Sequence, residues 1–249
     1  MLLHALRLLY ISVSFTIACL MGFIFVLLRP FNPDNTRRCA HLFAIPGVWG
    51  MGIKMEVDMQ HLHAQPRACV SVLNHQSNWD ILILARVVTA NTVTVGKHSL
   101  MWLPIFGQIY WLAGNILINR TNPKEAKQAM LKTTHALKDD NTSIWIFPEG
   151  TRNHGKGLLP FKRGAFLTAI NAGVPIVPVC CSSYQGHIRL NRWHAGTVAI
   201  RTLPPIRTEG LSPNDASALM DRCREDMLRC IAELDAECAR KDAAIWGGK

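Results

Sequence analysis

The pattern of apolar and polar positions divides the chain into a long apolar N-terminal segment and a region of alternating short runs. No charged residue occurs from Leu8 to Leu28. At about 1.5 Å per residue, a helix of that length measures roughly 31 Å, the thickness of the hydrocarbon core of a bilayer. The pattern predicts an N-terminal membrane helix, and it leaves open whether residues 8–28 cross the bilayer or enter one leaflet.

A cleaved signal peptide is the main alternative for this segment. The apolar run is too long for one, no small-x-small cleavage site follows it, and Arg29-Pro30 ends it abruptly. A second apolar stretch, from His41 to Ile53, is short and is interrupted by Pro46 and by glycines. We predict an interfacial or re-entrant helix there rather than a second span.

After the anchor, strand-like and helix-like patterns alternate. Short apolar runs predict strands at residues 68–73, 91–96, 116–119, 143–147, 175–181 and 196–203. Helices are predicted at 79–88, at 123–138 with Asn122 as its cap, at about 161–172 before Gly173, and from Ser212-Pro213 toward Arg240. This alternation predicts an α/β fold with a mixed, mostly parallel sheet flanked by helices. We place the membrane-anchoring segment at residues 1–58 and the α/β domain at residues 59–249.

The first polar cluster, Asn74 to Asp80 (NHQSNWD), follows the strand predicted at 68–73. A neutral imidazole accepts a proton on one ring nitrogen while the other holds its own, and a carboxylate that accepts this N–H fixes the tautomer. His75 lies at the end of the strand, and Asp80 lies at the start of the next predicted helix. The spacing predicts that the two side chains meet as a general base and the group that orients it.

The second polar cluster, Phe147 to Arg152 (FPEGTR), also follows a predicted strand. An arginine offers a fork of donors that matches phosphate oxygens, and a glycine lets the backbone approach a ligand closely. Ligands in open α/β sheets bind at the carboxyl ends of strands, where both clusters lie. The two clusters together predict one site that handles an anion.

These residues resemble the glycerolipid acyltransferase family, in particular its bacterial members that act on 1-acyl-sn-glycerol-3-phosphate. Four sequence blocks carry the resemblance in order: NHQSNWD at 74–80, GNILINR at 114–120, FPEGTR at 147–152 and VPIVPV at 174–179. In the second block, Leu117 stands where the family usually has an aromatic residue. The resemblance implies a membrane-embedded helical hairpin at the N-terminus and acyl transfer from a thioester to the sn-2 hydroxyl of lysophosphatidic acid, which gives phosphatidic acid.

The resemblance also suggests roles for individual residues. His75 is the expected general base and Asp80 its orienting partner, with Asn74 and backbone N–H groups near Gly150 as candidate oxyanion or positioning donors. We expect the substrate-binding residues to be Lys97, Arg120, Glu149, Gly150, Thr151 and Arg152, with the basic ones on the phosphate and Glu149 orienting an arginine or the glycerol. Val174–Val179 is most simply a buried strand, and its only functional interpretation is that it shapes the acyl pocket. No cofactor and no metal are expected, and the donor is acyl-CoA or acyl-carrier protein.

Charge supports a membrane-bound, anion-handling protein. The formal net charge is +10, and between Lys97 and Arg163 there are ten basic and four acidic residues. Such a surplus suits anionic lipid headgroups and acidic donors. Nucleic acid is an unlikely partner because no basic helix is interleaved with stacking aromatic residues.

The eight cysteines form no metal or disulfide pattern, since no C-x-x-C occurs and Cys180 and Cys181 are adjacent in a predicted strand. Cys223, Cys230 and Cys238 instead share one stripe of the last helix. Reduced thiols indicate a catalytic domain on the cytoplasmic side of a bacterial inner membrane. The sequence sets neither the acyl-chain length nor the oligomeric state.

Three other functions were weighed. Residues 150–157 nearly match a phosphate-binding P-loop, but Gly157 stands where that loop needs a hydroxyl for magnesium. Because of this partial match, a nucleotide-hydrolysing membrane protein is kept as an alternative function of another class. A catalytically silent membrane scaffold is a further alternative. An acyltransferase for a different lysolipid, such as a lyso-ornithine lipid, is the alternative within the class, although its acceptor lacks the phosphate that the basic residues suit.

Overall fold

The protein folds around one seven-stranded sheet. The structure, a computed structural model, describes residues 1–65, 68–119 and 122–247. Its strands are β1 (Ile53–Asp58), β2 (Val70–Leu73), β3 (Thr92–Lys97), β4 (Ile116–Ile118), β5 (Ser143–Ile146), β6 (Ile176–Cys181) and β7 (Gly196–Thr202). They lie in the order β1-β7-β6-β2-β5-β3-β4. Only the pairing of β6 with β7 is antiparallel among these strands, which confirms the predicted mixed, mostly parallel sheet.

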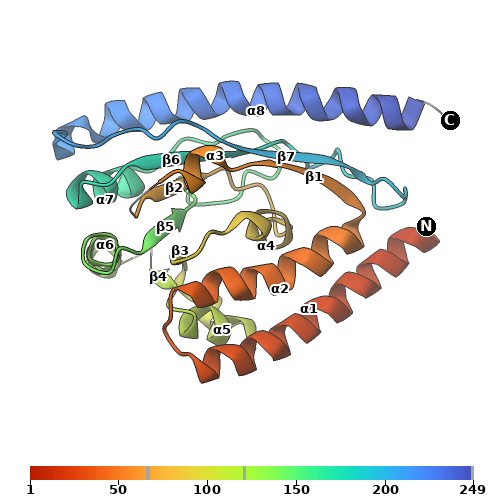
Figure 1. Ribbon diagram of the computed structural model, residues 1–249, viewed down its shortest axis with the longest axis horizontal. Helices are drawn as coiled ribbons and strands as arrows, with labels where there is room; N and C mark the ends of the chain where they lie inside the picture. Colours follow the sequence, from red (N-terminus) through yellow and green to blue (C-terminus); the bar gives the residue numbers. More distant parts are fainter. Residues whose placement is uncertain (66–67, 120–121, 248–249) are drawn as a thin grey trace.

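Helices cover both faces of the sheet (Figure 1). One face packs against α6 (Pro123–Lys138), α7 (Gly164–Ala172) and α8 (Ala216–Gly247). The other packs against α1 (Leu2–Leu28), α2 (Asp34–Met51), α4 (Asp80–Ile83) with the 3-10 turn Leu84–Val87, and α5 (Phe106–Leu112). The remaining short elements are α3 (Gln60–His63) and 3-10 turns at His98–Trp102 and Pro213–Asp215. Neighbouring residues of a strand point to opposite faces, so Cys180 belongs to the α8 core and Cys181 to the α2 core, as predicted.

The predicted helix ends follow from local chemistry. Asn122 caps α6 by accepting hydrogen bonds from the N–H groups of Lys124 and Glu125, and Gly173 ends α7 in the left-handed conformation, as the sequence indicates. Helix α7 begins at Gly164 rather than near Phe161, because the N–H of Lys162 binds the carbonyl of Pro148 instead of opening a helical turn. Helix α8 continues past Arg240 to Gly247.

The N-terminal region is a helical hairpin of α1 and α2, but the second helix differs from its prediction. Helix α2 begins at Asp34 and continues through Pro46 to Met51. The glycines do not break it. A Cβ atom on Gly50 would lie 2.5 Å from the ring of Tyr10, so this glycine lets α1 and α2 pack closely. Residues Ile53–Asp58, assigned to the helical segment from the sequence, form edge strand β1 beside β7.

Both ends of α1 are fastened to the α/β domain. Near its start, the guanidinium of Arg7 donates hydrogen bonds to the carbonyls of Leu190, Arg192 and Trp193. Just after its end, the N–H of Phe31 donates to the carbonyl of Leu112 in α5, with an N to O distance of 2.7 Å. Among the described residues, α1 is the one helix long and apolar enough to cross a membrane. Because both of its ends are bound to the α/β domain, α1 lies along that domain over its whole length.

Candidate active site

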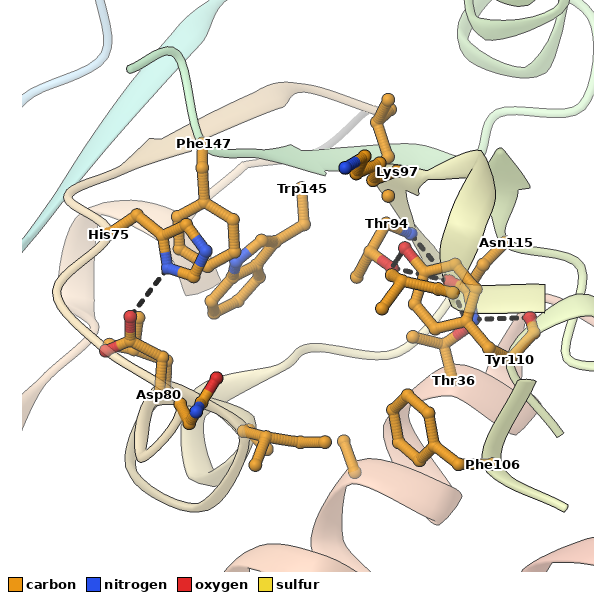
Figure 2. A pocket seen from close by; sticks show the side chains of 18 of the residues that line it. Thr36, His75, Asp80, Thr94, Lys97, Phe106, Tyr110, Asn115, Trp145 and Phe147 are labelled. Atoms are coloured by element: carbon orange, nitrogen blue, oxygen red, sulfur yellow. Dashed lines mark hydrogen bonds and ion pairs between the residues drawn. The ribbon is translucent and has the colours of Figure 1, made fainter. Parts of the chain in front are cut away.

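The His75–Asp80 pair lies at the carboxyl end of β2, which is the central strand of the sheet. The chain leaves β2 through a short loop, and helix α4 begins at Asp80. This turn brings the Nδ1 atom of His75 to 2.6 Å from Oδ2 of Asp80. The Asp80 carboxylate is buried, while a fifth of the His75 side chain is exposed. Figure 2 shows the two residues side by side in the wall of a cavity. The predicted contact between them is present.

Further donors converge on the Asp80 carboxylate. Its Oδ2 atom also accepts the backbone N–H groups of Gln76 and Ser77, at 2.7 and 3.1 Å. Its Oδ1 atom accepts the hydroxyl of Tyr184 at 2.7 Å, and the Ser77 hydroxyl lies 2.9 Å from that of Tyr184. Burial and the neighbouring Asp80 carboxylate raise the pKa of Tyr184, so its hydroxyl remains a neutral donor. The carboxylate is thus held in one orientation, with its lone pair toward His75.

Tyr184 was not anticipated from the sequence. It follows β6 and stands more than a hundred residues from Asp80, at a sequence separation of 104. Only the pairing of β6 with β2 brings its loop to the catalytic loop. The one local signal is that Tyr184 follows a predicted strand at its carboxyl end.

The FPEGTR loop contacts both the ring and the backbone of His75. The ring of Phe147 stacks on the imidazole with 4.1 Å between centroids. The Oε1 atom of Glu149 accepts the N–H of His75 at 2.6 Å, and its Oε2 atom accepts the N–H of Leu159 at 2.9 Å. Burial raises the pKa of Glu149, and the two N–H groups oppose that rise. Glu149 is not among the residues that line the cavity, and its carboxylate braces two backbone segments; its role in orienting an arginine or the glycerol stays a prediction.

Asn74 also braces the backbone. Its Nδ2 atom donates to the carbonyl of Cys181 at 2.8 Å, and its Oδ1 atom accepts the N–H of Cys181 at 2.9 Å. Asn74 is buried and does not line the cavity. The fold uses both ends of that amide to join β2 to β6, and the role of Asn74 as an oxyanion or positioning donor stays a prediction.

The cavity has a volume of about 700 Å³ and extends from His75 toward α2 and α5. The predicted residues Lys97, Gly150, Thr151 and Arg152 line it. Gly150 adopts a left-handed backbone conformation, with φ of +71°, which turns the loop back toward the cavity. The side chains of Lys97, Thr151 and Arg152 are exposed, as suits a mouth open to solvent. Arg120, the other predicted phosphate ligand, lies outside the described residues.

The rest of the wall is mainly apolar. It is formed by Cys39 and Phe43 of α2, Ile81 and Leu84 after the catalytic loop, Val95 of β3, and Phe106 and Ile109 of α5. Opposite His75, the Asn115 amide oxygen lies 3.0 Å from the Thr36 hydroxyl and 2.9 Å from that of Thr94 (Figure 2). Because these polar groups satisfy one another, this end of the cavity offers an apolar chain no unpaired polar group. No residue of Val174–Val179 lines the cavity, since that strand lies in the core of the sheet.

Comparison with known proteins gives the family. A family model described as acyltransferase matches residues 54–182, which carry the catalytic loop and the FPEGTR loop. The chain belongs to the acyltransferase family. A 1-acyl-sn-glycerol-3-phosphate acyltransferase of Escherichia coli is 41% identical over 243 residues, 98% of this chain and 99% of that protein. The enzyme of the same name from Haemophilus influenzae is 40% identical over 96% of this chain and 99% of that protein.

More distant proteins share part of the sequence or the fold. The human 1-acyl-sn-glycerol-3-phosphate acyltransferase alpha is 41% identical over 75% of this chain and 66% of that protein. A crystal structure of the 1-acyl-sn-glycerophosphate acyltransferase of Thermotoga maritima superposes with a TM-score of 0.75 at 24% identity, over 94% of this chain and 96% of that one. The two proteins therefore share the same fold over nearly the whole of both chains.

Proposed function

We propose that this acyltransferase transfers a fatty acyl group from a thioester to the sn-2 hydroxyl of 1-acyl-sn-glycerol-3-phosphate, which gives phosphatidic acid in phospholipid biosynthesis. The bacterial relatives of that name match the chain from end to end. The single observation that carries the chemistry is the 2.6 Å contact between His75 and Asp80 in the wall of a largely apolar cavity.

His75 is the proposed general base. With Nδ1–H donated to Asp80, its Nε2 atom carries the lone pair, and it forms no hydrogen bond to another described residue. The acceptor hydroxyl gives its proton to Nε2 while its oxygen attacks the thioester carbon. The tetrahedral intermediate then expels the thiolate, which takes the proton back from the imidazolium. No acyl-enzyme forms, because a thioester is already activated.

Donors for the oxyanion must come from the backbone of the FPEGTR turn. The N–H of Gly150 is hydrogen-bonded to the carbonyl of Phe147, at 3.1 Å. The next two N–H groups, of Thr151 and Arg152, belong to residues that line the cavity beside His75. We assign the oxyanion to these two groups, since fixed backbone donors stabilise developing charge at little reorganisation cost.

Lys97 and Arg152 are the proposed ligands of the acceptor phosphate, with Arg120 as a third expected ligand. Both described side chains are exposed at the lining of the cavity, and neither forms an ion pair with a described carboxylate. Their charge is therefore available to an anionic headgroup. The whole cavity has a volume of about 700 Å³, and its apolar part is the proposed site of an acyl chain.

The N-terminal hairpin is the proposed membrane anchor, and α1 lies in one leaflet rather than across the bilayer. Arg7 and Phe31 hold the two ends of α1 to the same domain, so a spanning α1 would pull that domain into the hydrocarbon. The outward face of α1 is apolar and exposed at Leu6, Leu9, Val13, Ile17, Leu20 and Ile24. Such a helix buries that face at the headgroup boundary. We place the α/β domain, which begins with β1, on the cytoplasmic side of a bacterial inner membrane, where its six free, buried cysteines stay reduced.

Mass spectrometry of products tests the proposed function. Purified protein is supplied with lysophosphatidic acid and either acyl-CoA or acyl-carrier protein, and phosphatidic acid should appear with at least one donor. A lyso-ornithine lipid serves as the control acceptor. Acylation of that lipid but not of lysophosphatidic acid would contradict the proposal.

The reaction is proposed to need no metal and no cofactor, because a histidine base and N–H donors suffice for a thioester. Treatment with a chelator should leave turnover unchanged. Loss of turnover that one divalent ion restores would contradict this.

A further inference from the structure

A second buried carboxylate lies far from the cavity, at the C-terminal end of α8. Asp242 is completely buried. One of its oxygens lies 2.6 Å from Nε2 of His187 and the other 2.7 Å from Nε2 of His194. The same carboxylate accepts the backbone N–H and the hydroxyl of Thr197. These bonds fasten the loop that joins β6 to β7 to the end of α8.

The fastened loop presents two arginines and a tryptophan to solvent. The guanidinium groups of Arg189 and Arg192 lie 5.2 and 4.9 Å from the ring centroid of Trp246, which orients them. Trp193, between Arg192 and His194, is 81% exposed. We call Arg189, Arg192 and Trp193 the loop patch. Trp193 thus places an exposed apolar ring beside two oriented cations.

The charge of the loop patch is uncompensated. The sequence contains no aspartate or glutamate from Gly150 to Thr208. Among the described residues, no carboxylate lies within ion-pair distance of Arg189 or Arg192. The guanidinium edges therefore remain available to an anion from outside the chain.

The loop patch adjoins the N-terminal end of α1. The guanidinium of Arg7 binds the carbonyls of Arg192 and Trp193 directly. Nearby, Trp49 of α2 is 74% exposed and packs edge-on against Tyr10 of α1, with 5.1 Å between ring centroids. Tryptophan and tyrosine side chains concentrate at the boundary between hydrocarbon and headgroups. The loop patch thus lies next to the helix that enters the leaflet, at the level of the headgroups.

We propose that the loop patch is a binding surface for anionic phospholipid headgroups, with Arg189 and Arg192 on the phosphates and Trp193 at the interface. It adds a specific contact with lipid headgroups to the apolar anchoring by the hairpin. Asp242, His187 and His194 act as the clasp that holds the loop in the conformation for this contact. The proposal rests on the membrane location given above, and not on the chemistry assigned to His75.

The bilayer is a better occupant than an acidic protein. A protein docked on the loop patch would have to cover Trp193 while α1 occupies the membrane directly beside it. A headgroup layer reaches both at once, because Arg7 joins the two elements. The same arginines could instead bind an acidic carrier protein, and the experiment below distinguishes this from binding to headgroups.

A reporter on the loop tests the contact in the full-length chain. All eight native cysteines are buried, so Asn191→Cys, at an exposed position of the loop, creates a single accessible thiol for a fluorophore. Lipids with a quencher on the headgroup should quench this reporter more in vesicles that contain phosphatidylglycerol than in phosphatidylcholine vesicles. The control reporter Ala232→Cys, exposed on α8 across the sheet from α1, should show no difference between the two. Equal quenching of the Asn191→Cys reporter in both vesicle types would overturn the proposal.

Removal of the two cations tests the charge. The double variant Arg189→Gln/Arg192→Gln is added to mixed phosphatidylglycerol and phosphatidylcholine vesicles, and its distribution between them is measured. Each arginine near an anionic surface contributes about fivefold, so the preference for anionic vesicles should fall by about 25-fold. The matched control Arg222→Gln/Arg229→Gln removes the same charge from α8 and should change the preference by less than about twofold.

Two results would overturn the proposal. One is an equal loss in the control pair, which would show an effect of net charge alone. The other is an unchanged vesicle preference with a higher KM for acyl-carrier protein, which would assign the loop patch to the carrier. Turnover on a soluble short-chain acceptor should stay within about twofold in the loop variant, so failure of the headgroup contact is distinguishable from failure of the proposed reaction.

Discussion

Two buried aspartates in this protein bind histidines, and they serve different ends. Asp80 binds Nδ1 of one histidine, at 2.6 Å, at the wall of a cavity of about 700 Å³. Asp242 binds Nε2 of two histidines, at 2.6 and 2.7 Å, away from that cavity. Both carboxylates also accept backbone N–H groups and a hydroxyl. The hydrogen bonds are nearly the same in kind and length.

The difference lies in what the other ring nitrogen meets. At Asp80, the distal Nε2 of His75 is left for a substrate, and Phe147 holds the ring flat beside the cavity. At Asp242, both histidines bind through Nε2, and their other nitrogens belong to rings that pack near Trp246 and do not line that cavity. A histidine–aspartate contact therefore indicates catalysis only where a cavity reaches the free nitrogen. The following experiments test this contrast, in order of expected effect.

The largest effect should come from the histidines themselves. His75→Ala removes the proton acceptor and should lower kcat by about 10²–10⁴-fold, and Asp80→Asn should cost somewhat less. His187→Ala should change kcat by less than about twofold, because that ring meets no cavity. Turnover is measured with a soluble short-chain acceptor. Near-normal turnover by folded His75→Ala would contradict the role of His75 as the general base.

The next largest difference should be in the KM for the acceptor, when one arginine of each region is replaced. Arg152→Ala should raise the KM for the acceptor by roughly 10–150-fold, since a hydrogen bond to a charged group is worth about 1.5–3 kcal/mol. Arg192→Ala, beside Trp246, should leave that KM unchanged on the same soluble acceptor. If Arg152→Ala instead weakened the donor alone, Arg152 would belong to the phosphates of the thioester.

Asp242 should matter for stability rather than turnover. Burial would raise the pKa of Asp242, but hydrogen bonds from Thr197 and His194 lower it to about 2. The unfolded pKa is near 3.9, so the charged carboxylate contributes about 2–3 kcal/mol that is present above pH ~4 and lost as the pH falls toward 2. Asp242→Asn should lower the free energy of unfolding by that amount at pH 7, with kcat retained.

Urea denaturation from pH 7 down to pH 3 measures the effect of Asp242→Asn. The gap between wild type and variant should narrow as the pH falls below about 4, because wild type then begins to lose the contribution of the charge. A gap that stays constant with pH would show that shape, not charge, is what Asp242 supplies.

The smallest effect should come from Tyr184. Tyr184→Phe removes the hydroxyl that binds Oδ1 of Asp80, and kcat should fall by about 3–10-fold, in line with one lost hydrogen bond. A kcat of Tyr184→Phe equal to that of wild type would contradict this role.

The two regions also differ in how far they were visible in the sequence. His75 and Asp80 are five residues apart in one loop, so strand-to-helix geometry alone brings them together. Asp242 bonds to His187 and His194 across 55 and 48 residues, and no spacing rule links such positions. His187 and His194 therefore look like ordinary surface histidines until α8 is laid across the sheet.

For two predicted site residues, the sequence did not show the contacts that their side chains make. Asn74 and Glu149 stand within the motifs, and polar residues at strand ends suggest contact with a ligand. Where their side chains point depends on Cys181 and on Leu159, which neighbouring strands and loops supply. A motif identifies the residue types that gather at a site, but not which of them face the cavity and which brace it.

What the sequence determined was whatever local periodicity and neighbouring residues decide. The apolar length of α1, the alternation of strands and helices, the caps at Asn122 and Gly173 and the pairing of His75 with Asp80 all depend on contacts within a few residues. What only the tertiary structure decided depends on segments far apart in the chain. Strand β1 forms because β7 offers it an edge, Tyr184 reaches Asp80 because β6 pairs with β2, and α1 is fastened at both ends by Arg7 and Phe31. The physical reason is that such contacts draw on partners 81 or more residues away, whose positions are set by the packing of the whole sheet.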